Sequence, residues 1–163
     1  MKRAGFTMIE LIFVIVILGI LAAVALPKFI GVSEQANAGK LKAYVGTLNR
    51  TVAPSLWAEA IADGSNGSIN GLTTAELNAQ IETPDIGDAA ATKLAITSPL
   101  ACSAYAAAAA NGAYSDAELA AWAANGTTTI GGVVYTIRCM DGSTAAAPHF
   151  TLFAAGNTVP LVR

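Results

Sequence analysis

The sequence is poor in charge, and its aromatic side chains are few. Asp, Glu, Lys and Arg make up 12% of its 163 residues, about half the usual fraction, and the net charge is −2. A weakly acidic chain has no excess of basic side chains to neutralise the phosphates of nucleic acid, so no such partner is indicated. Aromatic residues make up 7% of the chain, so the sequence gives little support to a role that depends on densely stacked aromatic side chains. The low charge suits a chain that buries surface against lipid and against copies of itself.

Motifs of catalysis and metal binding are also missing. His149 is the single histidine, and beside Phe150 in a predicted strand it is more often a partly buried structural residue than a base or ligand. No Cys-x-x-Cys, His-x-x-x-His, Walker loop or Gly-x-Ser-x-Gly pattern occurs. Six acids fall between Glu59 and Asp88, but their spacing does not match an EF-hand loop. We therefore expect no enzymatic activity, no cofactor and no metal.

The dominant feature of the sequence is one long apolar run, from Phe6 to Leu26, which Pro27 follows. As a helix, its roughly 21 residues would be about 31 Å long, close to the thickness of the hydrocarbon core of a bilayer. Glu10 interrupts the run, and a carboxylate at membrane depth costs on the order of 2.5 to 3.5 kcal/mol. The Leu, Ile, Val and Phe side chains contribute about −5 kcal/mol in total, so insertion remains favourable. An acid here indicates either a function or a position near headgroup water.

The residues at the start of this run form a motif. Lys2-Arg3-Ala4-Gly5 followed by Phe6-Thr7-Met8-Ile9-Glu10-Leu11, with Gly19 and Pro27 further on, resembles the N-terminus of type IV prepilins and pseudopilins. The resemblance extends from Lys2 to about Phe29. It implies that a membrane prepilin peptidase cuts after Gly5 and methylates the new amino terminus at Phe6. It also implies that Glu10 pairs with the terminal ammonium of a neighbouring subunit in a filament, and an acid in the first turn also complements the helix dipole.

On this resemblance, we expect a structural subunit of a type IV pilus-like filament that self-associates with the help of an inner-membrane assembly platform. A major pilin, a minor pilin and a pseudopilin of a type II secretion system all fit, although no glycine- and aspartate-rich calcium loop typical of major pseudopilins follows. Adhesion, motility, DNA uptake, electron transfer and secretion are all roles of such filaments. A rival interpretation is a secretory signal peptide with Ala23-Val24-Ala25 as its cleavage site, which would release a soluble binding module.

The charges around the run predict its orientation and the division of the chain. Because Lys2 and Arg3 precede it, we expect the amino terminus on the cytoplasmic side of a bacterial inner membrane, although Lys28 weakens this signal slightly. The rest of the chain would face the periplasm and, after assembly, form part of a periplasmic or cell-surface filament. The expected parts are a leader (1–5), a transmembrane or filament-core half-helix (6–27), an amphipathic half-helix (28–63) and a globular head (64–163).

A single long helix is predicted from Phe6 to about Asp63, where a glycine-rich stretch ends it. Pro27 should kink this helix, and Pro54 should kink it again or begin a separate short helix. Gly19 and Pro27 bracket a segment that we expect to be the least stable part of the helix. The resemblance implies that this segment becomes extended when subunits pack. Alternatively, Gly19 allows close approach of helices. Behind Pro27, apolar residues recur at helical spacing: Leu41, Tyr44, Val45, Leu48, Val52, Trp57, Ala60 and Ile61.

The head is predicted to be α+β, with a small antiparallel sheet packed on the outer half of the helix. Residues 65–99 are expected to be loop-like, apart from a short helix to about Ile81 that the capping box Thr73-x-x-Glu76 begins. Alternating residues predict strands over Gly132–Cys139 and His149–Ala154. Thr158–Arg163 could add a third strand, which Pro160 restricts to an edge.

The alanine-rich stretch 101–125 is expected to be helical. Ser115-x-x-Glu118 is a second capping box, and Asn125-Gly126 would end the helix. Within this stretch, Tyr114 and Trp122 are expected to pack in a core and not to stack on a ligand.

Cys102 and Cys139 are the only cysteines, and export would place both in an oxidising compartment. A disulfide between them would close about 38 residues and stabilise the domain by up to about 4 kcal/mol. The resemblance supports such a bridge, because many pilins carry one near the C-terminal end, where it bounds a variable surface loop. The alternative is two buried free thiols.

Overall fold

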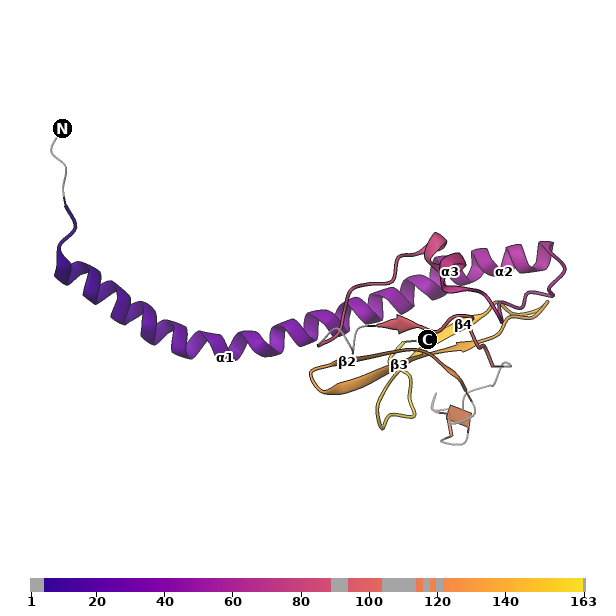
Figure 1. The fold of residues 1–163 in the computed structure, drawn as a ribbon. Helices are drawn as coiled ribbons and strands as arrows, with labels where there is room; N and C mark the ends of the chain where they lie inside the picture. Colours follow the sequence, from indigo (N-terminus) through magenta and orange to yellow (C-terminus); the bar gives the residue numbers. More distant parts are fainter. Residues whose placement is uncertain (1–4, 89–93, 104–113, 116–117, 120–121, 163) are drawn as a thin grey trace. The chain divides into compact units, whose positions relative to one another are not determined.

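The computed structural model describes residues 5–88, 94–103, 114–115, 118–119 and 122–162. The chain divides into two compact units, Met1–Ala36 and Asn37–Arg163. The first unit is the apolar part of the long helix, and the second contains the rest of that helix, a short helix and a β-sheet (Figure 1). The architecture is the α+β, pilin-like arrangement that the sequence predicts.

The long helix consists of three consecutive segments: α1 (Met8–Thr47), the π-helical turn η1 (Leu48–Val52) and α2 (Ala53–Ala62). α1 is continuous through Pro27, where one backbone N–H donor is missing. Pro54 lies in the first turn of α2, the position where a proline is tolerated, so it begins a separate segment behind the π-turn. The helix ends at Asp63, and Gly64 adopts the left-handed conformation with φ of 81°.

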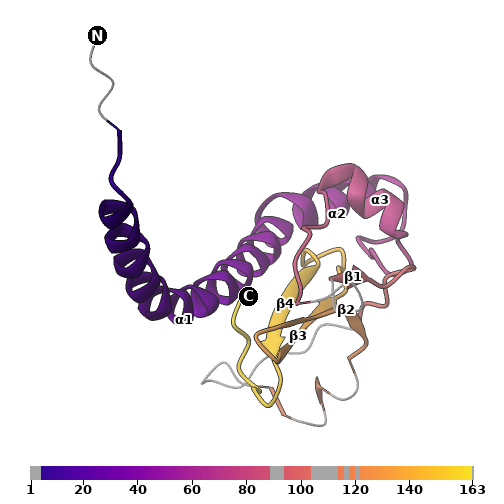
Figure 2. The same cartoon turned by 60° about the vertical axis from the view of Figure 1, so that its left-hand side comes forward.

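Within the second unit, the helix buries one face against the sheet, as its apolar periodicity predicts. Leu41, Val45 and Leu48 are at most 1% exposed, and they pack with Ile137, Phe150 and Leu152 of the sheet. Figures 1 and 2 both show the sheet lying alongside this stretch of helix. At roughly 25 cal/mol per Å² of apolar surface removed from water, this shared core is the main source of stability of the unit.

The sheet has four antiparallel strands in the order β1-β2-β3-β4, so each strand pairs with its neighbour in sequence. The strands are β1 (Ala95–Ile96), β2 (Ala124–Ile130), β3 (Val133–Met140) and β4 (His149–Ala154). β3 and β4 match the two strands predicted from alternation, and Ile137 pairs with Leu152 in their register. Gly131 and Gly132, both with positive φ, form the turn between β2 and β3.

Three predictions about the head were wrong. Asn125 and Gly126 do not end a helix but lie inside β2, where Asn125 is 1% exposed and bonds both backbone groups of Ala101. The stretch 65–99 contains the short edge strand β1. Thr158–Arg163 does not form a strand in its described part, because only Val162 bridges the sheet, opposite Leu152.

The capping box at Thr73 forms as predicted and begins α3 (Thr74–Gln80). The Glu76 carboxylate accepts hydrogen bonds from the Thr73 backbone N–H and hydroxyl, and the Thr73 hydroxyl oxygen accepts the Glu76 N–H. These bonds lower the pKa of Glu76 below its ordinary value of 4.5, because hydrogen bonds to the charged form favour it.

The alanine-rich stretch lies largely outside the described residues, so its predicted helix is judged only at a few positions. There, Ser115 and Glu118 form the second capping box. Tyr114 and Trp122 pack edge to face with their ring centroids 4.7 Å apart, and Phe153 of β4 completes the cluster. These two aromatic residues therefore belong to a small second core, as predicted.

The predicted disulfide between Cys102 and Cys139 is present. It joins the segment after β1 to the end of β3, and Ser103 continues this contact by bonding the backbone of Cys139 and Asp141. The bridge therefore lies beside an isolated parallel β-bridge between Ser103 and Met140, the last residue of β3.

The end of α2 is fixed to the loop before β4 by a close backbone approach. The indole Nε1 of Trp57 donates to the carbonyl oxygen of Ser143 over 2.7 Å. Gly67 has φ of 81°, and a Cβ atom there would lie 2.6 Å from the same oxygen. Only glycine fits both the conformation and the space.

Candidate functional site

The first unit exposes an apolar helix surface that nothing within the unit covers. All described side chains from Phe6 to Val24 are exposed, and the helix is long and apolar enough to cross a membrane by length and composition. The most apolar 18-residue window has a mean hydropathy of 3.0. Such a surface requires lipid or other protein around it, because water solvates it poorly.

The start of this helix is organised by a capping box that the sequence analysis missed. Thr7 is the residue before α1, and Glu10 is the third residue inside it. The Thr7 backbone N–H donates to Glu10 Oε2 over 2.9 Å, and the Thr7 hydroxyl donates to the same oxygen over 2.6 Å. The Glu10 N–H in turn points to the Thr7 hydroxyl oxygen, at 3.4 Å. The signal was available, because Thr7-x-x-Glu10 has the same spacing as Thr73-x-x-Glu76.

The capping box fixes the carboxylate of Glu10 at the positive end of the helix. Both hydrogen bonds that Thr7 donates reach one carboxylate oxygen, Oε2. Between Gly5 and Pro27, Glu10 is the only side chain with a charge, so its own segment supplies no basic partner. A carboxylate in apolar surroundings is stabilised most by a cation that also donates hydrogen bonds.

The junction between Gly5 and Phe6 lies before the helix. Both residues are exposed, and regular helix begins at Met8. Beside this junction, a shallow hollow of about 330 Å³ lies on the flank of the helix, lined by Phe6, Ile9, Glu10, Phe13 and Val14. Gly5, Phe6 and Glu10 therefore lie within six consecutive residues at one end of the helix.

Gly19 and Pro27 lie further along the same helix. A Cβ atom at Gly19 would meet no heavy atom within 4 Å, so the packing of this chain does not require a glycine there. The helix continues through both positions, and its predicted softening in a filament stays a prediction.

No group of three or more His, Cys, Asp or Glu side chains converges on a point that could hold a metal ion in the part of the chain that the structure describes. His149 begins β4, opposite Met140 of β3.

Comparison with known proteins finds one family model and one relative that match part of the chain. Residues 1–26 match the family model described as the prokaryotic N-terminal methylation motif. A segment of 43 residues is 51% identical to the type IV narrow pilus major component PilA5 of Thermus thermophilus. That alignment covers 26% of this chain and 37% of the length of the Thermus protein. No solved structure matches the chain.

The fold is α+β with a pilin-like architecture, and its capped apolar helix is long and apolar enough to anchor the chain in a membrane. The two matches show that the chain is similar to proteins with the prokaryotic N-terminal methylation motif and to a type IV pilus component.

Proposed function

We propose that this chain is the structural subunit of a type IV pilus-like filament. The observation that carries the proposal is the capped Glu10, the only charged side chain between Gly5 and Pro27, a few residues behind the Gly5–Phe6 junction. A carboxylate in this position weakens insertion into a bilayer but offers a binding site for a cation of a neighbouring copy. The matching N-terminal motif supports the same conclusion.

In this proposal, a prepilin peptidase cuts the bond between Gly5 and Phe6 and methylates the new amino group. The exposure of both residues, outside regular helix, supports access of a protease to this bond. Cleavage converts the Phe6 nitrogen from a neutral amide into an ammonium group, so each mature copy gains the cation that its Glu10 carboxylate needs.

Assembly then follows from pairing between copies. Glu10 of one copy accepts hydrogen bonds from the Phe6 ammonium of a neighbour, while the apolar flanks of the helices cover one another. The same patch on each copy meets a different patch on the next, and a heterologous contact of this kind builds an open helical filament. Gly19 and Pro27 are proposed to let the helix extend locally during this packing.

Before assembly, the 6–27 segment is proposed to span the bacterial inner membrane with the leader on the cytoplasmic side, because Lys2 and Arg3 lie there. An inner-membrane platform would then move the subunit into the filament. In this division, 28–63 is the amphipathic half of the helix and 64–163 the head. We propose no catalytic role for the chain.

The proposal is tested by the intact mass and N-terminal sequence of the protein isolated from its native cell envelope. A chain that begins at Phe6 and carries one additional methyl group is the expected result. A chain that begins near Leu26 would instead show an ordinary signal peptide and would overturn the filament function.

A second candidate is a pseudopilin of a type II secretion system, or a minor pilin. The Thermus relative is a pilus major component, which favours the major pilin. Shearing of whole cells separates these versions. A major pilin is abundant in the sheared extracellular fraction, whereas a pseudopilin stays in the envelope, and its deletion causes a secretion defect.

A further inference from the structure

A hollow in the second unit lies on the face of the sheet that is turned away from the long helix. Along β3, Ile137 and Cys139 belong to the core that the helix covers, so Thr136 and Arg138, which alternate with them, lie on the opposite face. On that face, a hollow of about 350 Å³ lies beside the end of β4 and the turn that follows it. Its lining combines one cation with other polar groups and an apolar wall, and it includes Thr136, Arg138, Asn157, Thr158, Leu119 and Phe153.

The guanidinium group of Arg138 is partly buried at this hollow without a negative partner. It donates from Nη1 to the carbonyl oxygen of Trp122, which is a neutral acceptor. Its Nε is buried and has no hydrogen-bond partner in the described part of the chain. Burial lowers the pKa of Arg138, because loss of water disfavours the charged form, but a guanidinium group stays charged at neutral pH. A partly buried cation of this kind is stabilised by an anion.

The described residues around the hollow do not provide that anion. None of those that line it is acidic. Glu118, which precedes Leu119 in the chain, directs its carboxylate to the backbone N–H and hydroxyl of Ser115. The cation at the hollow is therefore available to a negatively charged group from another molecule.

The other groups of the lining indicate what the rest of that molecule contains. A guanidinium group is planar and binds a carboxylate through two parallel hydrogen bonds, and the bond to Trp122 occupies only one of its five N–H donors. Thr136, Asn157 and Thr158 add hydroxyl and amide groups, which both donate and accept hydrogen bonds. A ligand that matches this lining carries one carboxylate and several hydroxyl groups on a compact body.

We propose that this hollow binds a uronic acid, a sugar whose ring carries one carboxylate. The carboxylate lies against Arg138, and the ring hydroxyls exchange hydrogen bonds with Thr136, Asn157 and Thr158. The volume of the hollow is in the range of pockets that bind small molecules, and it has room for one sugar ring. The inference goes beyond the filament function. Because one chain forms the whole hollow, binding does not require assembly.

Titration of the purified full-length chain with sodium D-galacturonate tests the site, in a detergent that has no sugar headgroup. D-galactose is the matched neutral probe, and acetate is the carboxylate without a ring. We expect saturable binding of galacturonate and an affinity for galactose that is lower by about tenfold or more, because galactose lacks the charged hydrogen-bond acceptor. Acetate that binds as tightly as galacturonate would overturn the assignment to a sugar acid.

A linear chain of four galacturonate rings distinguishes the two sources of such a ligand. Tighter binding of the four-ring chain than of galacturonate supports a site for an acidic polysaccharide, whereas equal binding supports a site for the free sugar acid.

Substitutions then locate the binding. Arg138→Gln should lower the affinity for galacturonate by about tenfold or more, while Arg50→Gln, which removes an exposed cation that does not line the hollow, should leave it unchanged. Circular dichroism checks that the Arg138 variant is folded, because its guanidinium also bonds Trp122. Asn157→Ala changes an exposed side chain and should lower the affinity severalfold in a folded chain.

An affinity that neither Arg138→Gln nor Asn157→Ala changes would overturn the site, and so would the absence of binding by the unaltered chain. Neither result bears on the filament function, which the mass of the mature chain tests separately.

Discussion

The side chain of Asn49 bonds both backbone groups of Phe150, a residue 101 positions later in the chain. Its Nδ2 donates to the Phe150 carbonyl over 2.8 Å, and its Oδ1 accepts the Phe150 N–H over 2.7 Å. Asn49 lies in the π-helical turn, and Phe150 lies in the last strand of the sheet. One side-chain amide thus joins the helix to β4 with the same pair of hydrogen bonds that a neighbouring strand would make.

Replacement of Asn49 with Ala should lower the free energy of unfolding of the second unit by about 2 kcal/mol. Two partly buried backbone groups would lose their partner, and unsatisfied groups cost about 1 to 3 kcal/mol each when fully buried. Thermal unfolding of the full-length chain in detergent, followed by circular dichroism, measures the change. Thr51→Ala, which removes only an exposed hydroxyl bonded within the helix, should change stability by less than about 0.5 kcal/mol. Equal effects of the two variants would contradict this role of Asn49.

Replacement of both Cys102 and Cys139 with Ala should cost up to about 4 kcal/mol, because the bridge spans 37 positions and restricts the unfolded chain. Since stability of a domain is itself only about 5 to 15 kcal/mol, the variant should accumulate poorly in cells. Urea unfolding of the purified chain with and without a reductant measures the same difference in the unaltered protein. Coincident unfolding curves would show that the bridge contributes little.

Two substitutions separate the cap of the first helix from its charge. Glu10→Gln removes the charge but retains a side chain that fits a capping box, whereas Thr7→Val removes the cap and retains the charge. We expect Glu10→Gln to lower filament yield by at least about tenfold, because a hydrogen bond to a charged group contributes about 1.5 to 3 kcal/mol. Thr7→Val should cost only about 1 kcal/mol of helix stability and leave most filaments intact.

Membrane insertion should be unchanged in both variants, and fractionation of the envelope provides that control. If Thr7→Val abolished filaments while Glu10→Gln assembled normally, the helix cap and not the pairing of charges would be the essential feature.

The capping box of α3 should weaken at acidic pH. The hydrogen bonds from Thr73 lower the pKa of Glu76 below 4.5, so the folded state holds this carboxylate ionised more strongly than the unfolded state does. Its contribution to stability is therefore present above pH 4.5 and is lost as the pH falls through the lowered pKa.

Carboxyl carbon shifts in NMR follow this titration in the full-length chain. Thr73→Ala should move the midpoint of Glu76 upward toward 4.5, while that of Glu118, which Ser115 lowers in the same way, should not move. If the titration midpoint of Glu76 does not change in Thr73→Ala, the hydrogen bonds from Thr73 to the Glu76 carboxylate do not form in solution.

The spacing of apolar residues predicted the helices and strands in which burial of one face determines the sequence pattern. The apolar stripe from Leu41 to Leu56 and the alternation in β3 and β4 arise directly from burial of one face, and both were found. β2 was missed because Ala124–Ile130 contains polar residues at positions that alternation would make apolar. Asn125 is buried there only because the Ala101 backbone lies opposite it, a tertiary contact that no local pattern reveals.

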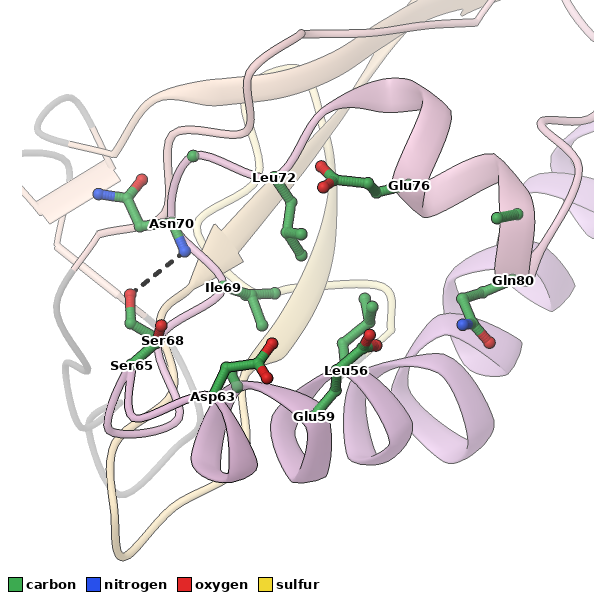
Figure 3. Close-up of a pocket in the computed structure, with 13 residues that line it drawn as sticks. Leu56, Glu59, Asp63, Ser65, Ser68, Ile69, Asn70, Leu72, Glu76 and Gln80 are labelled. Carbon is green, nitrogen blue, oxygen red and sulfur yellow. Dashed lines mark hydrogen bonds between the residues drawn. The ribbon is translucent and has the colours of Figure 1, made fainter.

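The candidate site shows the same limit. The motif around Gly5 and Glu10 is visible in the sequence, but the bonds that hold the Glu10 carboxylate depend on where the helix begins. Elsewhere in the second unit, a hollow of about 420 Å³ between α2 and α3 brings together the acids Glu59, Asp63 and Glu76 (Figure 3). The sequence shows these acids only as a run of charge, because their convergence depends on the path of the chain from Asp63 to Thr73.

The contact between Asn49 and Phe150 also determines when the second unit can close during synthesis. The helix leaves the ribosome about 100 residues before β4 does, which at 5 to 20 residues per second is an interval of about 5 to 20 s. During that interval, Leu41, Val45 and Leu48 lack the complete sheet that covers them in the folded unit, and chaperones and proteases have access to this apolar stripe. Truncation before His149 should therefore yield a rapidly degraded chain and not a smaller folded one.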